Sequence, residues 1–299
     1  MAKKQKVLVI VGPTSSGKSA LAVALARRLD GEVISADSRQ VYRGLDIGTG
    51  KITKREKRGI PHYLLDEVSP RRIFTADDFV RRGCVAIADI SSRGKLPIVA
   101  GGTGFYIDAL VGRILLPNVP PNKKLRAQLE EKPASQLFTL LKKKDPRRAK
   151  TIEPQHKRRL IRALEVVSAL GKVPMIDLQN QSSFDPLWLG ITLQSKVLER
   201  KIRMRLRERM RQGMVAEARR LHAGGLSYKR MEELGLEYRS LARLLQGTIT
   251  RGQMIDELNR AISKYAIRQL RYWKRNKDIR WFMPSKTATI EKAVRVWLK

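Results

Sequence analysis

Short apolar runs alternate with amphipathic segments over the first third of the chain. The apolar runs are residues 6–11, 32–36 and 96–100. They are rich in Val, Ile and Leu and too short for buried helices, so they predict strands. Segments 18–29 and 76–93 repeat apolar residues at helical spacing, and Thr75 is the expected N-cap of the second. Strands alternating with helices predict an α/β fold with a parallel sheet covered on both faces.

The middle of the chain changes character at about residue 113. Prolines punctuate it at positions 117, 120, 121, 133, 146, 154, 174 and 186. Short helical patterns lie between them, at 123–131 and 155–170. We therefore expect a small helical insertion domain over residues 113–189, within a core formed by residues 1–112 and 190–299.

Apolar periodicity resumes after the insertion. A strand is expected at 188–192, followed by one long helix at 195–222. Its apolar face comprises Leu198, Ile202, Leu206, Met210, Met214, Ala218 and Leu221. These methionines are expected in the core, with the arginines between them on the other faces.

Composition narrows the class of protein. Hydrophobic residues make up 42% of the 299 residues, which excludes a disordered chain. A single cysteine, Cys84, excludes an internal disulfide and a zinc site built from thiolates, and it fits a reducing cytoplasm. No apolar run is long enough to span a membrane, and the charged start of the chain is unlike a signal peptide.

Charge indicates the kind of partner. Lysine and arginine number 62 against 28 acidic residues, which gives a formal net charge of +34. Such an excess repels itself in a compact state unless a polyanion neutralises it. A solvated basic surface is the plain alternative, but the size of the excess favours contact with nucleic acid.

A phosphate-binding loop follows the first strand. Residues Gly12, Pro13, Thr14, Ser15, Ser16, Gly17, Lys18 and Ser19 match G-x-x-x-x-G-K-[ST] in full. An apolar strand precedes the motif and a helix follows it, which is the context that the motif requires. Backbone N–H groups and the helix N-terminus would cradle a diphosphate, with Lys18 on the terminal phosphate and Ser19 on Mg²⁺.

A P-loop specifies a diphosphate but not a reaction. Phosphoryl transfer also needs an aspartate that holds magnesium at the end of an apolar strand. The strand at 96–100 ends instead in Gly101-Gly102-Thr103, without an acid. The strand at 32–36 ends at Asp37, whose carboxylate would suit a general base beside the diphosphate, although an aspartate in a surface turn is the commoner case.

Several segments together resemble the tRNA dimethylallyltransferases, also called IPP transferases. They are residues 12–19, 35–49, 61–66, 101–106, 159–165, 235–239 and 266–269. Their order and spacing match over nearly the whole chain, and the run S-A-D-S-R-Q-V-Y-R-G-L-D-I-G-T at 35–49 is the most specific part. The resemblance implies a P-loop NTPase-like α/β fold with a helical insertion.

The resemblance also implies an activity. Dimethylallyl diphosphate would be the donor, and the N6 amine of the adenosine immediately 3′ of the anticodon would be the acceptor. Asp37 would bind that amine and take its proton, Thr103 would lie by the leaving oxygen, and Arg205 would face the diphosphate held by residues 12–19 with Mg²⁺. The residues implied at the tRNA are Asp37, Ser38, Arg39, Gln40, Arg126, Arg158, Arg159, Arg162, Gly235, Tyr238 and Arg239. The expected protein is a cytoplasmic monomer.

The sequence departs from the family pattern in a few places. These are Gly50-Lys51-Ile52 after the D-I-G-T run, Lys201 in the segment before Arg205, and Ile267, Arg271 and Tyr272 near the C-terminus. None of them falls in the P-loop or on Asp37 or Thr103. They bear on the tRNA contacts of the last long helix more than on the catalytic core.

Two other functions compete with this interpretation. A P-loop kinase for a small molecule would share the fold, but the missing second acid and the basic charge count against it. A non-catalytic RNA-binding protein with a vestigial P-loop would share the charge, but the intact Lys18 and Ser19 count against that.

Overall fold

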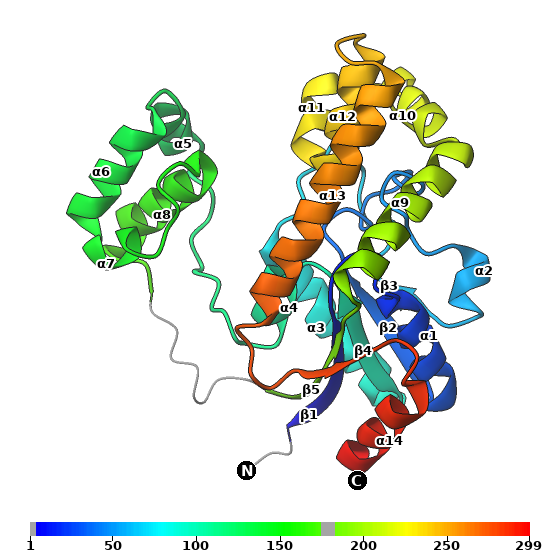
Figure 1. Cartoon of the computed structure of the whole chain (residues 1–299). Coiled ribbons are helices and arrows are strands. Elements are labelled where there is room, and N and C mark those ends of the chain that lie inside the picture. The colour runs from blue at the N-terminus through cyan, green and yellow to red at the C-terminus, as the bar shows by residue number, and fades with distance from the viewer. Residues whose placement is uncertain (1–3, 175–182) are drawn as a thin grey trace. The chain divides into compact units, whose positions relative to one another are not determined.

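The computed structural model describes residues 4–174 and 183–299 and divides the chain into two compact units. One unit is Met1–Gly112 with Ser182–Lys299, and the other is Arg113–Gln181 (Figure 1). The first boundary falls at the predicted residue. The second lies earlier than predicted, because the strand β5 already begins at Phe184 and a boundary at residue 189 would cut through it.

The first unit contains one parallel sheet. In the described part of the chain its strands are β1 (Gln5–Val11), β2 (Gly31–Ala36), β3 (His62–Tyr63), β4 (Leu96–Gly101), β5 (Phe184–Ile191) and β6 (Arg280–Phe282). They pair in the order β3-β2-β4-β1-β5-β6, and every pairing is parallel. The α/β prediction from the apolar runs is confirmed.

Strand β5 includes Pro186, which the sequence pattern assigned to the insertion. Pro186 pairs with Val7 of β1, whereas β6 pairs only with residues 189–191. One edge of β5 is therefore unpaired at Pro186, and a residue without an N–H group is tolerated at such an edge.

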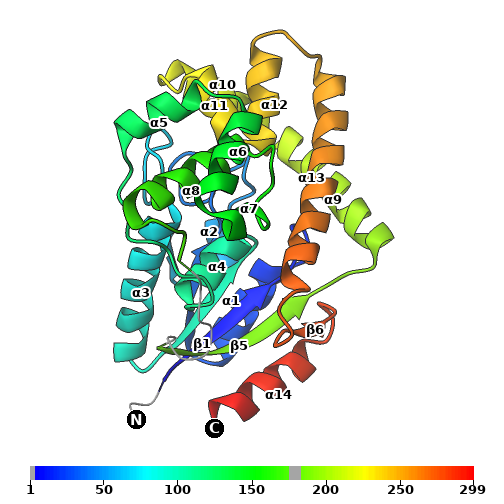
Figure 2. The same cartoon turned by 90° about the vertical axis from the view of Figure 1, so that its left-hand side faces the viewer.

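Helices cover both faces of the sheet. Alternate residues of β1 point to opposite faces, so Val7 and Val9 join one apolar cluster while Leu8 and Ile10 join the other. The face with Leu8 is covered by α1 (Lys18–Arg28) and α14 (Thr287–Leu298), the latter beside β5 (Figure 2).

The opposite face carries α3 (Ala76–Ser92), α4 (Gly104–Leu110) and α13 (Arg251–Trp273). Thr75 begins α3 as predicted, because its side chain accepts the Asp78 N–H at 3.1 Å. Helix α13 is anchored over the sheet by Trp273, whose ring lies 5.9 Å from the buried ring of Trp188 on β5.

The remaining helices of this unit are α2 (Lys54–Lys57), α9 (Ser195–Arg211), α10 (Met214–Ala223), α11 (Tyr228–Leu234) and α12 (Leu236–Leu245). The prediction of one helix over 195–222 is wrong. Gly213 adopts φ 97°, a left-handed conformation that ends α9 and lets α10 begin in a new direction. The apolar spacing continued across the break, which is why the pattern concealed it.

The second unit has an apolar core of its own. Its helices are α5 (Lys123–Glu130), α6 (Ala134–Lys144), α7 (Pro146–Ala149) and α8 (Lys157–Leu170). Leu137 and Leu141 of α6 pack with Leu160 of α8, and none of the three is exposed to solvent. The predicted helical patterns at 123–131 and 155–170 correspond to α5 and α8.

Replacing Gly213 tests the break between α9 and α10. Gly213→Ala should destabilise the protein by about 1–2 kcal/mol, because a side chain disfavours the left-handed conformation. Space is not limiting, since an added Cβ would meet only Ala216 at 3.8 Å. The control is Gly252→Ala within α13, which should raise stability by up to about 1 kcal/mol. Urea unfolding measures both, and equal effects would contradict this assignment.

Candidate active site at the carboxyl ends of three strands

Three neighbouring strands end at one edge of the sheet, where ligands bind in open α/β folds. The P-loop follows β1, the segment Gly102–Gly104 follows β4, and Asp37 follows β2. Two hydrogen bonds join the last two segments: the Thr103 N–H donates to the Ala36 carbonyl at 3.1 Å, and the Ser38 N–H donates to Thr103 Oγ1 at 3.1 Å. Thr103 and Asp37 are thus held side by side.

The P-loop has the conformation of an anion cradle. Ser15 and Gly17 adopt φ 61° and 97°, and α1 begins directly after Gly17 without a side-chain cap. The first N–H groups of α1 are therefore open to a ligand. Ser16 is fully buried, and its Oγ has no hydrogen-bond partner among the described residues. A buried hydroxyl of this kind fits a site that a phosphate oxygen completes.

Lys18 is buried beside the loop that it serves. Its Nζ donates to the Pro13 carbonyl at 2.5 Å. Burial, and after it the positive charge of Arg205, lower the pKa of Lys18 to about 7, although the carboxylate of Asp37 opposes both effects. These interactions show that Lys18, Arg205 and Asp37 act on one another electrostatically.

Asp37 is half-buried in a turn that fixes its carboxylate. Oδ1 accepts the N–H groups of Arg39 at 2.8 Å and Gln40 at 3.3 Å. No described residue forms a hydrogen bond with Oδ2. One oxygen therefore orients the side chain and the other remains available to a substrate.

Thr103 occupies the N-cap position of α4, but its side chain does not cap that helix. Its Oγ1 instead accepts the Ser38 N–H, as described above. Thr103 is therefore not a side-chain cap, and its own hydroxyl proton remains available at the site.

Arg205 reaches this edge from α9. Its Nη2 donates to the Gly50 carbonyl at 2.7 Å. Gly50 has φ 59°, and a Cβ there would lie 2.6 Å from Nη2. Glycine at position 50, one of the departures noted in the sequence, is therefore what allows this close approach.

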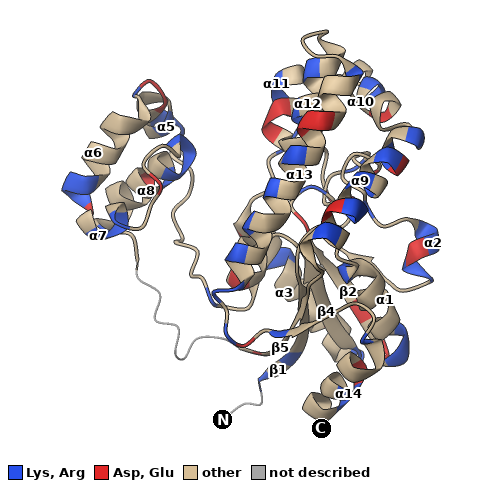
Figure 3. Cartoon of the chain, in the orientation of Figure 1, with Lys and Arg blue, Asp and Glu red and all other residues tan. Residues whose placement is uncertain are grey.

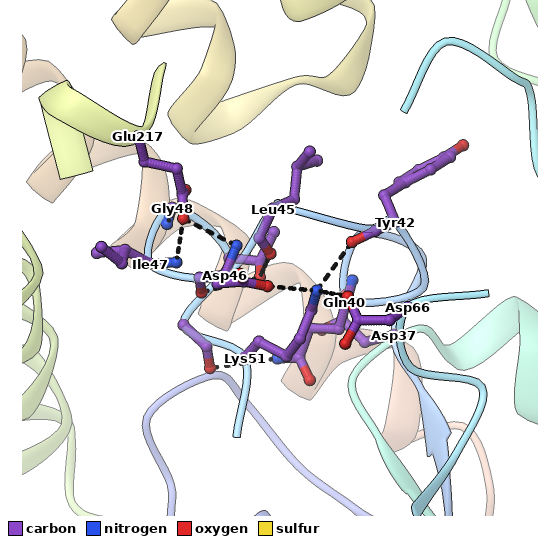
Figure 4. A network of polar contacts seen from close by, with 12 residues as sticks. Asp37, Gln40, Tyr42, Leu45, Asp46, Ile47, Gly48, Lys51, Asp66 and Glu217 are labelled. Atoms are coloured by element: carbon purple, nitrogen blue, oxygen red, sulfur yellow. Dashed lines mark hydrogen bonds and ion pairs between the residues drawn. The ribbon is translucent and has the colours of Figure 1, made fainter. Parts of the chain in front are cut away.

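The loop that carries Gly50 is held by a buried glutamate. Glu217, on α10, is 3% exposed. It accepts the N–H groups of Asp46, Ile47 and Gly48 at 2.7–3.0 Å (Figure 4). The Tyr238 hydroxyl donates to the same carboxylate at 2.6 Å, and burial followed by the charge of Glu217 raises the pKa of Tyr238.

Lys51 supports the other side of the same loop. Its Nζ donates to the Tyr42 carbonyl at 2.8 Å and pairs with Asp46 at 2.7 Å and Asp66 at 2.5 Å. Figure 4 shows these partners converging on the ammonium group. Sequence reasoning missed the roles of Glu217 and Lys51, since no local pattern links residue 217 to residues 46–48.

Comparison with known proteins identifies the family. The profile of the family described as IPP transferase matches residues 40–276. A tRNA dimethylallyltransferase of Syntrophotalea carbinolica is 41% identical over 90% of each chain. One from Anoxybacillus flavithermus is 36% identical over 97% of this chain and 94% of its own. The chain belongs to the IPP transferase family.

Solved structures of IPP transferases share the fold. The tRNA isopentenylpyrophosphate transferase of Bacillus halodurans is 34% identical, covers 98% of this chain and 96% of its own, and has a TM-score of 0.74. A eukaryotic dimethylallyltransferase described as acting on tRNA is 28% identical, covers 93% of this chain and 73% of its own, and has a TM-score of 0.81. The P-loop NTPase-like fold expected from the sequence is confirmed.

The residues that the family resemblance assigned to tRNA differ in solvent exposure and in hydrogen bonding. Tyr238 is 1% exposed and donates to Glu217, so its side chain supports the loop, and a tRNA contact at Tyr238 stays a prediction. Gly235 is the residue between α11 and α12, with φ 78°. Arg239 is exposed, and Ser38 and Arg39 are half-buried. Gln40 Nε2 donates to the Gly50 carbonyl at 3.4 Å.

Four of the assigned arginines lie in the second unit. Arg126 and Arg162 both pair with the buried Glu165, and the Arg126 pair is 2.8 Å long. Burial raises the pKa of Glu165, but the hydrogen bonds from the two arginines outweigh it and lower that pKa to about 2. Arg158 and Arg159 are exposed on α8, and neither forms an ion pair with any residue of 4–174 or 183–299. Glu165 thus orients one pair, and the other pair is open to a polyanion.

The part of this IPP transferase that the structure describes has neither a cluster of metal-ligating side chains nor a membrane-spanning helix. No group of three or more His, Cys, Asp or Glu side chains there has an arrangement suited to a metal ion. No helix there is both long and apolar enough to cross a membrane.

The low pKa of Lys18 predicts how diphosphate affinity changes with pH. A diphosphate binds the charged amine, so above pH 7 the free protein must first take up a proton. The affinity advantage of the wild type over Lys18→Ala should therefore shrink as pH rises from 6 to 9, by up to about tenfold per pH unit. Calorimetry with inorganic diphosphate at each pH measures the ratio of the two affinities. The Ala variant reports the titration of the ligand alone, and an unchanging ratio would contradict the prediction.

Proposed function

We propose that this chain is a tRNA dimethylallyltransferase, which transfers the dimethylallyl group of dimethylallyl diphosphate to N6 of the adenosine immediately 3′ of the anticodon and releases diphosphate. The observation that carries the proposal is the juxtaposition at the sheet edge. A diphosphate cradle, a half-buried carboxylate and a free hydroxyl lie together there. The family membership supports the same reaction.

The donor side of the reaction needs positive charge. As the C1–O bond of dimethylallyl diphosphate breaks, negative charge builds on the departing oxygens. The N–H groups at the start of α1, Lys18 and Arg205 would bind those oxygens, and the Thr103 hydroxyl would donate to the leaving oxygen. These groups are already oriented in the free protein, so little reorganisation is required when charge develops.

The acceptor side needs a base and a fixed nucleophile. Asp37 would receive a hydrogen bond from the N6 amine through Oδ2, because Oδ1 already accepts two backbone N–H groups. The amine nitrogen forms a bond to C1, its proton passes to Asp37, and the electron pair of the C1–O bond leaves with diphosphate. The adenine must leave the base stack to reach the site, which bases of a single-stranded loop do at low cost.

Magnesium fits the site through the substrate. Ser19 lies in the first turn of α1, is exposed, and has a hydroxyl of the kind that holds Mg²⁺ in P-loops. With no cluster of acidic ligands among the described residues, the oxygens of the diphosphate would supply the other ligands. Bound Mg²⁺ would neutralise part of the charge of the leaving diphosphate.

The tRNA partner is supported by charge. Lysine and arginine residues recur along α9 and α13 (Figure 3). We further propose that the second unit binds the anticodon stem-loop through Arg158 and Arg159, with Arg126 and Arg162 oriented by Glu165. We also propose that the protein acts as a cytoplasmic monomer.

Label transfer tests the proposed function directly. The protein would be incubated with tRNA and dimethylallyl diphosphate labelled in the prenyl group, and in parallel with ATP labelled in the γ-phosphate. We expect prenyl label on one adenosine beside the anticodon and no phosphate label on RNA or on small molecules. Transfer of phosphate without transfer of the prenyl group would favour the kinase and overturn the proposal.

Asp37 is predicted to be the general base. Asp37→Asn keeps an oxygen that can accept the N–H groups of Arg39 and Gln40, so the turn should persist. We expect the single-turnover rate to fall about 10²–10⁴-fold, while tRNA affinity stays near that of the wild type. The control Asp30→Asn removes an exposed carboxylate that pairs with Lys95 at 3.0 Å and should leave the rate unchanged. A normal rate in Asp37→Asn would remove Asp37 from the mechanism.

Thr103 is predicted to act on the leaving oxygen. Thr103→Val should lower the single-turnover rate by up to about 10²–10³-fold, the usual effect of losing one donor to a developing oxyanion. Thr103→Ser keeps the hydroxyl and should retain most of the rate. If Thr103→Val instead lowered the melting temperature while the rate stayed within about threefold of normal, a difference below 1 kcal/mol, its role would be structural.

Affinity for tRNA is predicted to fall steeply with salt. Each phosphate contact contributes about −0.7 to −0.9 to the slope of log K against log salt. Replacing Arg158 and Arg159 together by Gln should make the slope shallower by roughly 1.5, on the same basis. The control is Arg81→Gln, since Arg81 on α3 pairs with Asp77 and Asp78. Binding curves at several salt concentrations give the slope for each protein. An unchanged slope in the double variant would exclude phosphate contacts of Arg158 and Arg159.

A further inference from the structure

Gln269 joins two of the loops that form the site. It lies on α13 and is 6% exposed. Its Oε1 accepts the Thr14 N–H of the P-loop at 2.8 Å, and its Nε2 donates to the Gly102 carbonyl at 3.0 Å. A single side chain from a distant segment thus bridges the loop after β1 and the loop after β4.

The two partners require a side chain that both donates and accepts, as an amide does. A backbone N–H can only donate and a carbonyl can only accept, so the orientation of the Gln269 amide is fixed by its two contacts. A carboxylate at position 269 cannot donate to Gly102, and an aliphatic side chain serves neither partner. Either change leaves a buried backbone group without a hydrogen bond.

Glycines at positions 102 and 104 leave room for the side chains of α13. A Cβ on Gly102 would lie 2.1 Å from Gln269 Nε2, so no other residue at 102 permits the same approach. One turn further along α13, Tyr272 packs against Gly104, where a Cβ would lie 2.3 Å from its ring. The Tyr272 hydroxyl donates to Asp108 Oδ2 at 2.5 Å. Helix α13 is therefore in contact with the chain on both sides of Thr103.

We infer that Gln269 is a positioning residue for prenyl transfer, which sets the separation between the diphosphate cradle and the pair formed by Thr103 and Asp37. The inference rests on the proposed function. Thr103 follows Gly102 directly, and its Oγ1 holds the Ser38 N–H beside Asp37. A shift of Gly102 is therefore passed on to the leaving-group donor and to the base together.

The expected consequence is a loss of rate with little loss of diphosphate binding. The P-loop keeps its strand-loop-helix frame without Gln269, so the cradle persists. The reacting groups, however, are displaced relative to one another, and a misplacement of about 1 Å costs on the order of 10²-fold in rate. A residue that only packs α13 against the core would instead alter stability and leave the rate of the folded protein unchanged.

The first test compares Gln269→Leu with Glu257→Gln. Glu257 also lies on α13 and pairs with Arg243 of α12 at 2.7 Å, so its loss weakens the anchoring of α13 without touching either loop. We expect Gln269→Leu to lower the single-turnover rate about 10²-fold while its Kd for inorganic diphosphate changes by less than about threefold. Glu257→Gln should leave both within about threefold of the wild type. Equal rates for the two variants and the wild type would overturn the inference.

The second test uses Gln269→Glu and keeps the inference falsifiable if the Leu variant folds poorly. A protonated carboxyl group has one donor and one acceptor, like an amide, whereas the ionised form has no donor. The rate of Gln269→Glu relative to the wild type should therefore rise as pH falls from 8 to 5. The titratable groups around the site, Lys18, Asp37, Asp108 and Tyr272, are present in both proteins, so the ratio removes their contribution. A ratio independent of pH, with both proteins folded, would contradict the role of the donated hydrogen bond.

The outcome for the wild type separates this inference from the proposed function. If the wild type transfers no prenyl group to tRNA, the proposed function fails, whatever the variants do. If the wild type is active and the Gln269 variants match it in rate and in pH profile, only the positioning role fails.

Discussion

The two hydrogen bonds that tie Thr103 to the end of β2 are the contacts on which the site depends. In a parallel sheet, neighbouring strands deliver their carboxyl ends to one edge, but the loops that follow can diverge. Here the Thr103 N–H and Oγ1 bind the residues on either side of Asp37, at 3.1 Å each. Because β4 also pairs with β1, the P-loop lies next to this pair. The fold thereby brings together a diphosphate cradle and a carboxylate that are adjacent in no part of the sequence.

The sequence predicted those parts of the structure that local patterns encode. The apolar runs, the P-loop and the strand that ends at Asp37 each carry their signal within a few residues, and the structure contains them. The break at Gly213 was concealed because apolar spacing continued across it, and only the backbone conformation of one glycine ends the helix. Tyr238 resembled a surface contact in the motif, yet its environment is set by Glu217 from another helix. Tertiary partners of this kind leave no local pattern to detect.

The electrostatics of the site favour a bound anion. Lys18 is buried, Arg205 lowers its pKa further, and the hydroxyl of Ser16 is buried without a partner among the described residues. In the free protein these features are unfavourable, because like charges repel and a buried polar group is unsatisfied. A bound diphosphate would relieve all of them at once. A few cations of this basic chain are thus gathered at one sheet edge, while others, such as Arg158 and Arg159, are exposed to solvent.

The position of both reactants is tested most directly by a structure of the protein bound to inorganic diphosphate and an RNA anticodon stem-loop. We expect diphosphate against residues 14–19 and an unstacked adenine whose N6 lies within about 3.2 Å of Asp37 Oδ2. Thr103 Oγ1 should lie between that amine and the nearest diphosphate oxygen. An adenine bound elsewhere, or a diphosphate outside the P-loop, would contradict the central claim that one edge of the sheet holds both reactants.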